Sequence, residues 1–280
     1  MLLVGFAATL LTCGCSVPME ALVTPSRGED DQFSTVQQSG YLSAASESLE
    51  YSVGWNGIPG ATFRIKTRQE KIAGRELLSI GFSGATSRTV EWAWRYRLNG
   101  VTYATPSLGL PICSARVSTE NGDTDMTTLR FDRDQRSVHR VEKELQDGYE
   151  ASGDSVSFQQ GLDIPAALMF LRGLNWEPGC THRIEIVEDE AQLVELTALR
   201  NREIKTPAGT FDAVEIQVRV EPARAEGQKG HDPGRYHGGR IWLSRDQRHV
   251  PLVLQAEVFV GYVYAELVNV ETQHRACNGP

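Results

Sequence analysis

Catalytic chemistry has no recognisable signature in this sequence. A serine nucleophile typically sits on a sharp Gly-x-Ser-x-Gly elbow, and the stretch from Gly81 to Gly84 lacks that spacing. Asp132 and Asp134 form a carboxylate pair, but they fall in an expected turn where solvent keeps both ionised. We therefore expect neither enzymatic activity nor a cofactor. A hydrolase whose catalytic residues come together only in the folded protein is the third hypothesis.

Metal chemistry has one candidate cluster. His231, Asp232 and His237 carry imidazole and carboxylate groups that suit zinc. They show no ligand-spacing motif, and His249 is separated from them by an expected strand. Solvated surface histidines explain the cluster better, so we expect no metal.

Three aromatic residues form the best candidate for a ligand-binding surface. Trp92, Trp94 and Tyr96 alternate with Ala93 and Arg95, which places the aromatic rings on one face of an expected strand. Such rings combine apolar area with a polar tip and can line a cavity for an apolar, lipid-like or glycan ligand. The same alternation is typical of an ordinary core, which is the more common explanation.

A Gly-rich, charged stretch at residues 222–239 is expected to be a long surface loop. Between Arg219 and His249 the chain has seven Lys and Arg against four acidic residues, an excess that could meet an anionic partner. A solvated face of mixed charge is the simpler explanation. The residues that we expect to face a partner are Arg224, Lys229, His231, Arg235 and His237.

Composition limits the class of partner. The chain has 280 residues, 40% of them hydrophobic, which is enough for one large domain with a core. Its formal net charge of -8 and its pI near 5.4 disfavour nucleic acid, because binding phosphates needs a concentrated basic surface. Nucleic acid is therefore not an expected partner.

The first fifteen residues predict export to the cell envelope. Residues 1–15 are an apolar run that ends in small residues and cysteine, typical of a signal peptide. Gly14 before Cys15 favours lipidation of Cys15, with secretion to the periplasm without a lipid as the alternative. Residues 16–46 are polar and without periodicity, which indicates a flexible tether. We expect an outer-membrane lipoprotein that faces the periplasm.

Three cysteines remain after the leader: Cys113, Cys180 and Cys277. An oxidising compartment permits one disulfide and leaves one thiol. Cys180 with Cys277 is our preferred pair, because such a bridge would fix the tail at residues 273–280. Three unpaired cysteines are the alternative.

Strand patterns dominate residues 47–272, which we predict to be a single antiparallel β domain. Alternation is clear at residues 50–55, 61–66 and 77–82, continues at 92–98, and is strong at 214–220. Strands are also predicted at 129–132, 184–186, 193–199, 240–243, 250–260 and 262–270. Residues 137–145 fit a strand or a helix.

Two local signals fix further elements. A short helix is predicted at residues 164–172, with Asp163 as N-cap, Pro165 in the first turn and Gly173 in a left-handed conformation at the end. The sequence Pro207-Ala208-Gly209 predicts a three-residue hairpin loop with a bulge.

Four segments in order resemble one bacterial envelope family. They are residues 50–60, the helix end at Phe170-Leu171-Arg172, Thr206 to Phe211, and Trp242 through Leu252. Together they are similar to the family called domain of unknown function 3108, over roughly residues 49–270. The resemblance implies a secreted, mostly antiparallel β domain, often lipidated, and supplies no catalytic residues.

These observations predict an all-β, mostly antiparallel chain that forms an open or flattened β-barrel-like sheet with one short helix. The expected function is a noncatalytic envelope lipoprotein, a binding or assembly component on the periplasmic side of the outer membrane. Its partner would be an unknown envelope protein or an apolar or glycan ligand. The alternative is a periplasmic carrier of an apolar or lipid-like ligand.

Overall fold

The computed structural model describes residues 46–106, 109–145, 149–188, 190–222, 238–258 and 261–273. Its strands and helix are β1 (Ser46–Trp55), β2 (Ile58–Ile72), β3 (Arg75–Thr86), β4 (Tyr96–Ala104), β5 (Pro111–Glu120), β6 (Asp123–Asp132), β7 (Ser137–Glu144), β8 (Tyr149–Ser157), α3 (Ile164–Leu171), β9 (Thr181–Val187), β10 (Ala191–Thr206), β11 (Gly209–Pro222), β12 (Gly238–Ser244), β13 (Pro251–Glu257) and β14 (Tyr262–Gln273).

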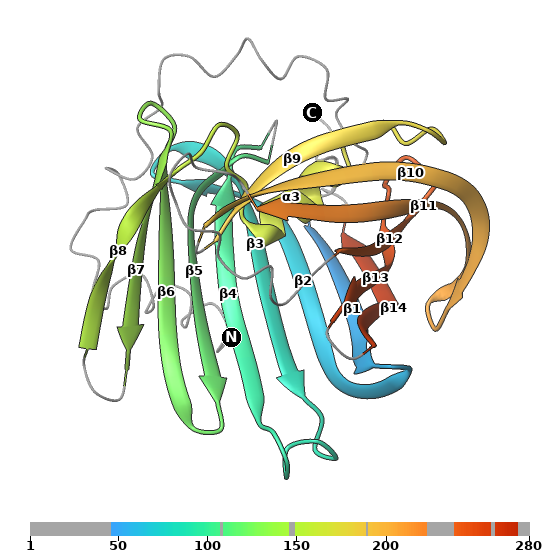
Figure 1. Ribbon diagram of the computed structural model, residues 1–280, viewed down its shortest axis with the longest axis horizontal. Coiled ribbons are helices and arrows are strands. Elements are labelled where there is room, and N and C mark those ends of the chain that lie inside the picture. Colours follow the sequence, from blue (N-terminus) through green and yellow to red (C-terminus); the bar gives the residue numbers. More distant parts are fainter. Residues whose placement is uncertain are drawn as a thin grey trace, which may run out of the picture.

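The strands form a single antiparallel sheet. Its 14 strands run in the order β8-β7-β6-β5-β4-β3-β2-β1-β14-β13-β12-β11-β10-β9. Each strand pairs with its neighbour in sequence, and β1 also pairs with β14, which joins the first half of the chain to the second. The sheet curls into a nearly closed barrel whose edge strands are β8 and β9 (Figure 1). The predicted fold class is confirmed.

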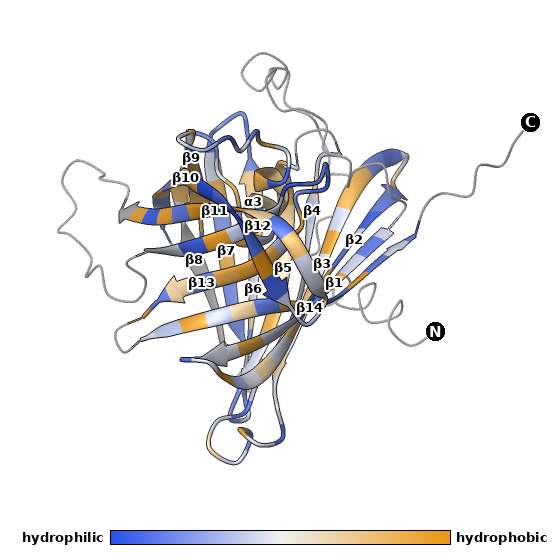
Figure 2. Cartoon of the chain, turned by 90° about the vertical axis from the view of Figure 1, so that its right-hand side faces the viewer, coloured by the Kyte–Doolittle hydropathy of each residue, from blue (hydrophilic) through white to orange (hydrophobic). Residues whose placement is uncertain are grey.

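Period-two alternation explains most of the strands. In β1 the side chains of Glu47, Leu49 and Tyr51 are buried and those between them are half-buried. Figure 2 shows the corresponding alternation of hydrophobic and hydrophilic residues along the strands. Residues 137–144 are strand β7, so the helical spacing noted there is not used.

Two predictions about strands and turns were wrong, and two strands were missed. Residues 90–93 form a turn and β4 begins only at Tyr96, because the backbone amides of Ala93 and Trp94 bond to the carbonyl of Val90 rather than to a neighbouring strand. Strands β5 and β8 were not predicted. The hairpin between β10 and β11 has a two-residue turn, since Thr206 pairs directly with Gly209.

Helix α3 lies inside the barrel and buries Ala166, Ala167, Met169, Phe170 and Leu171. Asp163 is its N-cap, as predicted, and accepts a hydrogen bond from the Ala166 amide at 2.9 Å. Gly173 does not end the helix in a left-handed conformation. The amides of Arg172 and Gly173 bond to the carbonyls three residues earlier, so the last turn tightens and needs no left-handed residue. In the described part of the chain, no helix has the length and apolar character required to cross a membrane.

The segment that carries α3 also crosses the gap between the two edge strands. Glu185 on β9 accepts hydrogen bonds from the backbone amides of Gln159, Gln160 and Gly161. Arg133 donates to the Gly161 carbonyl at 2.9 Å. Between the edge strands β8 and β9, the described residues include no strand to pair with this backbone. The side chains of Glu185 and Arg133 supply its hydrogen-bond partners instead.

A buried ion pair fixes the other end of the helix. Arg172 and Glu47 are both almost fully buried, and the two guanidinium nitrogens lie 2.5 and 3.0 Å from the carboxylate oxygens. Arg172 Nε donates to the Arg248 carbonyl at 2.9 Å, and His249 Nδ1 lies 2.9 Å from the Arg172 carbonyl. Tyr51 donates to the Pro251 carbonyl at 3.0 Å. Segments that carried the family resemblance therefore meet around one arginine, which indicates a structural role for them.

Candidate functional site

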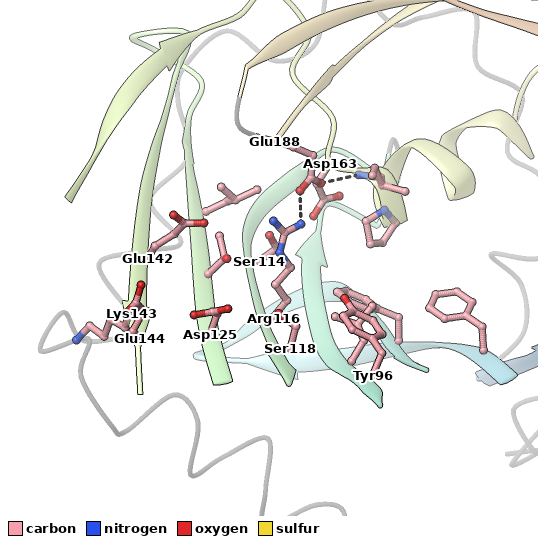
Figure 3. A pocket seen from close by; sticks show the side chains of 17 residues that line it. Tyr96, Ser114, Arg116, Ser118, Asp125, Glu142, Lys143, Glu144, Asp163 and Glu188 are labelled. Carbon is pink, nitrogen blue, oxygen red and sulfur yellow. Dashed lines mark hydrogen bonds and ion pairs between the residues drawn. The ribbon is translucent and has the colours of Figure 1, made fainter. Parts of the chain in front are cut away.

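A cavity of about 710 Å³ lies within the barrel, between strands β2 to β7 and the first turn of α3. Figure 3 shows its side chains, which converge on the space from several strands. The lining residues are Phe63, Phe82, Tyr96, Leu98, Ser114, Arg116, Ser118, Asp125, Thr127, Leu129, Glu142, Lys143, Glu144, Asp163, Ile164, Pro165 and Glu188.

Strand register places these residues in rows across the barrel wall. Two rows follow the Cα pairing from β2 to β7: Phe63, Gly84, Leu98, Ser118, Asp125 and Glu144 in one, and Ile65, Phe82, Gly100, Arg116, Thr127 and Glu142 in the next. Phe63 on β2 supplies the aromatic ring of the first row and Phe82 on β3 that of the second, and each row ends with a carboxylate on β7. The cavity wall is therefore amphipathic, with an aromatic side and a charged side.

Two glycines make room for the aromatic side. A Cβ atom at Gly100 would lie 2.2 Å from Phe82 Cζ, and one at Gly84 would lie 3.1 Å from Phe63 Cδ2. Both glycines sit one strand away from the phenylalanine in the same row. The rings can lie across the sheet only because these positions have no side chain.

The inner end of the cavity is closed by the N-terminus of α3. Asp163 is buried there (Figure 3). Thr102 on β4 donates its hydroxyl to Asp163 Oδ2 at 2.5 Å. Burial raises the pKa of Asp163 from 3.8 to about 6, against the lowering effect of its bonds to Thr102 and Ala166. Arg116 forms an ion pair with Glu188 beside this group. The polar groups at the inner end are thus paired with one another.

The outer end of the cavity carries carboxylates that face each other. Asp125 on β6 and Glu144 on β7 are directly opposite in register, and both are exposed. Cross-strand groups of like charge repel each other, so a cationic group between them would be stabilised. Over the whole lining there are five acidic residues and two basic ones, which gives the cavity a net negative charge.

The predicted aromatic residues divide between the cavity and its edge. Tyr96 lines the cavity, whereas Trp92 and Trp94 lie in the exposed loop before β4 and do not line it. Trp94 stacks on Tyr96 with ring centroids 5.4 Å apart and donates its indole N–H to Glu120 at 2.9 Å. The expected strand would have placed all three rings on one face of the sheet. The loop before β4 instead leaves the two tryptophans at the outer end of the cavity, which we call its mouth.

The other predicted site residues are placed only in part. Cys15, Cys277 and the loop residues Arg224, Lys229, His231, Arg235 and His237 lie outside the described residues. Cys180 is a half-buried free thiol just before β9. Within the described ranges, no group of three or more His, Cys, Asp or Glu side chains has an arrangement suited to a metal ion.

Sequence reasoning missed most of the cavity. Phe63 was placed on the correct face of a strand, and Asp163 was identified as a helix cap, but neither was connected with a cavity. Strand β5 was missed although Cys113, Ala115 and Val117 alternate with Ser114, Arg116 and Ser118, and it is the polar set that points into the cavity. A further signal was the pairing of each inward phenylalanine with a glycine on the neighbouring strand, Phe63 with Gly84 and Phe82 with Gly100.

One solved structure shows a similar fold. A crystal structure of a β-barrel-like protein of domain of unknown function DUF1849 from Brucella abortus is similar, with a TM-score of 0.53 and 9% identity, covering 82% of this chain and 98% of that chain. A candidate lipoprotein from Parabacteroides distasonis matches with a TM-score of 0.34 and 9% identity, covering 84% of this chain and 99% of that one. No curated protein sequence matches the chain. The family model described as Protein of unknown function (DUF3108) matches residues 50–268, and the chain therefore belongs to this family.

Proposed function

We propose that the protein is a noncatalytic binding protein of the cell envelope that holds an amphipathic ligand in its barrel cavity. The observation that carries this proposal is the change from aromatic to carboxylate side chains along each row of the cavity wall. Volumes of several hundred cubic ångströms are typical of small-molecule sites. The cavity of about 710 Å³ falls in that range.

The cavity wall also indicates the chemistry of the ligand. An apolar portion would pack on Phe63, Phe82 and Leu98, where it removes hydrocarbon from water. Its polar end would lie toward Asp125 and Glu144 and be cationic or neutral, because an anion there would be repelled by the excess of carboxylates. We infer that the cavity serves as a carrier site for this class of ligand, and of the three aromatic residues expected to line such a cavity, Trp92, Trp94 and Tyr96, only Tyr96 does so.

Envelope location rests on the sequence of the leader. Residues 1–15 end in the cysteine that we propose to be lipidated, and the binding domain would then be tethered to the periplasmic face of the outer membrane. Mass spectrometry of the mature N-terminus tests this part alone. A mature chain without acyl groups on Cys15 would reject the anchor and leave the cavity proposal intact.

Binding is tested with amphiphiles of one chain length and different head groups. Dodecyltrimethylammonium, dodecyl maltoside and dodecyl sulfate are titrated below their micelle concentrations, with calorimetry as the readout. We expect the cation to bind about tenfold or more tighter than the sulfate, since a charge contact at the mouth is worth on the order of 1 kcal/mol, favourable for the cation and unfavourable for the sulfate, which makes a difference of about 2 kcal/mol. Equal affinity for all three head groups, or binding to none, contradicts the proposal.

Two substitutions on β5 locate the binding site. Ser118 lines the cavity, whereas Thr119, the next residue along the strand, points to the other face of the sheet. Ser118→Trp should fill the cavity and weaken binding of the cation by about tenfold or more. Thr119→Trp is the matched control and should leave the affinity unchanged. The same loss in both variants would place the amphiphile elsewhere.

A further inference from the structure

Exposed hydrophobic side chains gather at one end of the barrel. The described residues contain eight large hydrophobic side chains that are exposed: Trp55, Ile58, Trp92, Trp94, Leu145, Ile164, Leu199 and Val268. The first five lie in or beside the turns β1–β2, β3–β4 and β7–β8. Isolated exposed hydrophobic residues are ordinary, but five of them in three turns mark an interaction surface.

Topology explains why these turns lie together. In an antiparallel meander every second connection is at the same end of the sheet, so the turns after β1, β3 and β7 share one end (Figure 1). The mouth of the cavity is at this end as well, because Tyr96 and Glu144 are the strand residues next to two of the turns. We call this surface the rim and define it as residues 55–58, 87–95 and 145.

The rim is held in place without being buried. The amide of Ser87 bonds to the Gly60 carbonyl at 2.8 Å, which joins the β3–β4 loop to β2. Within the loop, the amides of Val90 and Trp94 bond to the carbonyls of Ser87 and Val90. Trp92 is nevertheless 87% exposed and Ile58 is 68% exposed. The hydrophobic side chains are therefore presented to solvent on an ordered backbone.

The residue types fit a lipid surface. Tryptophan favours the interface between hydrocarbon and head groups, because its ring is largely apolar and its N–H needs a polar partner. Arg88 and Arg95 are exposed on either side of the tryptophans in the β3–β4 loop. Guanidinium groups at that depth can donate to lipid phosphates.

We propose that the rim docks on a phospholipid bilayer, with its tryptophan and aliphatic side chains in the head-group region and the cavity mouth against the lipid. The contact would be reversible, because a few inserted side chains bury far less apolar area than a spanning helix. Docking does not depend on the cavity binding any ligand, so the two proposals can fail separately.

Vesicle binding tests the proposal directly. The full chain is prepared with Cys13→Ser and Cys15→Ser, so that no variant carries an acyl anchor, and is mixed with vesicles of phosphatidylethanolamine and phosphatidylglycerol. Flotation measures partitioning, and quenching of tryptophan fluorescence by brominated lipid measures insertion. We expect Ile58→Ser with Trp92→Ser to reduce the partition coefficient by about tenfold, because each substitution removes apolar area from the contact.

The matched control is Leu199→Ser with Val268→Ser, which removes two exposed hydrophobic side chains from other parts of the surface. This variant should partition like the parent, and equal melting temperatures should confirm that all variants are folded. Arg88→Gln with Arg95→Gln should reduce binding most in vesicles rich in phosphatidylglycerol. Equal partitioning of the rim and control variants overturns the proposal. It is also overturned if the parent does not bind vesicles and the rim variant instead abolishes a dimer seen by sedimentation.

Discussion

Replacing Asp163 with asparagine should change how the stability of the protein depends on pH. Asp163 is buried at the inner end of the cavity, and its pKa is raised from 3.8 to about 6, chiefly by burial. Asparagine is as good an N-cap and can accept the same hydrogen bond from the Ala166 amide. It has no charge to bury. The substitution therefore removes the titration and keeps the helix start.

The sign of the effect follows from proton binding in the two states. Below pH 3.8 the carboxyl group is neutral in both the folded and the unfolded chain. Between pH 3.8 and about 6 the folded protein holds a proton that the unfolded chain has lost, so the free energy of unfolding falls as pH rises. At 1.36 kcal/mol for each pH unit, the span from 3.8 to about 6 amounts to about 3 kcal/mol.

Urea denaturation of the two proteins from pH 3.5 to 7.5 measures this quantity. The difference in free energy of unfolding, Asp163→Asn minus wild type, should rise by about 3 kcal/mol across the range and level off above about pH 6. Contributions from other titrating groups cancel in the difference. Asp132→Asn, at the cap of an exposed turn where Asp132 bonds to the Gln135 amide, controls for loss of a capping carboxylate. A difference that stays constant with pH would refute the assignment of Asp163 as a destabilising buried acid.

Two further predictions concern packing. Arg172→Met should lower the free energy of unfolding by about 3–5 kcal/mol, because it leaves the Glu47 carboxylate buried without its partner, and adding Glu47→Leu should recover most of that loss in a urea titration. If the double variant is no more stable than the single one, the ion pair is not what fixes the helix. Gly100→Ala should lower the free energy of unfolding by about 1–3 kcal/mol, since its Cβ would lie 2.2 Å from Phe82 Cζ. Gly81→Ala, whose Cβ would make only an ordinary contact at 3.7 Å, is the control, and equal thermal stability of the two alanine variants would contradict the clash.

The strands that sequence reasoning found are those with one apolar face. Tyr51, Phe63 and Ile216 each belong to an alternating run, and each lies in a strand. Helix α3 was located equally well, because an N-cap and a proline mark its start. Strand β5 was missed because its inner face is built from serine and arginine, and the apolar residues of its other face, Cys113, Ala115 and Val117, form only a short run. Sequence patterns therefore performed worst at the cavity wall, where a candidate ligand site replaces the core.

The ion pair between Arg172 and Glu47 was likewise invisible, because 125 residues separate its partners and only the tertiary fold brings them together. The same holds for the exposed Trp92, whose period-two neighbours indicated a strand although local hydrogen bonds form a turn.

The amino-acid sequence by itself determined the β class, the short helix and the family, since these depend on short-range periodicity, local capping chemistry and motif order. Tertiary structure decided which polar side chains face inward, which carboxylates stand opposite each other, and which turns share the end where the cavity opens. Those relations depend on strand register and on the order of strands in the sheet, which couple residues far apart in the chain.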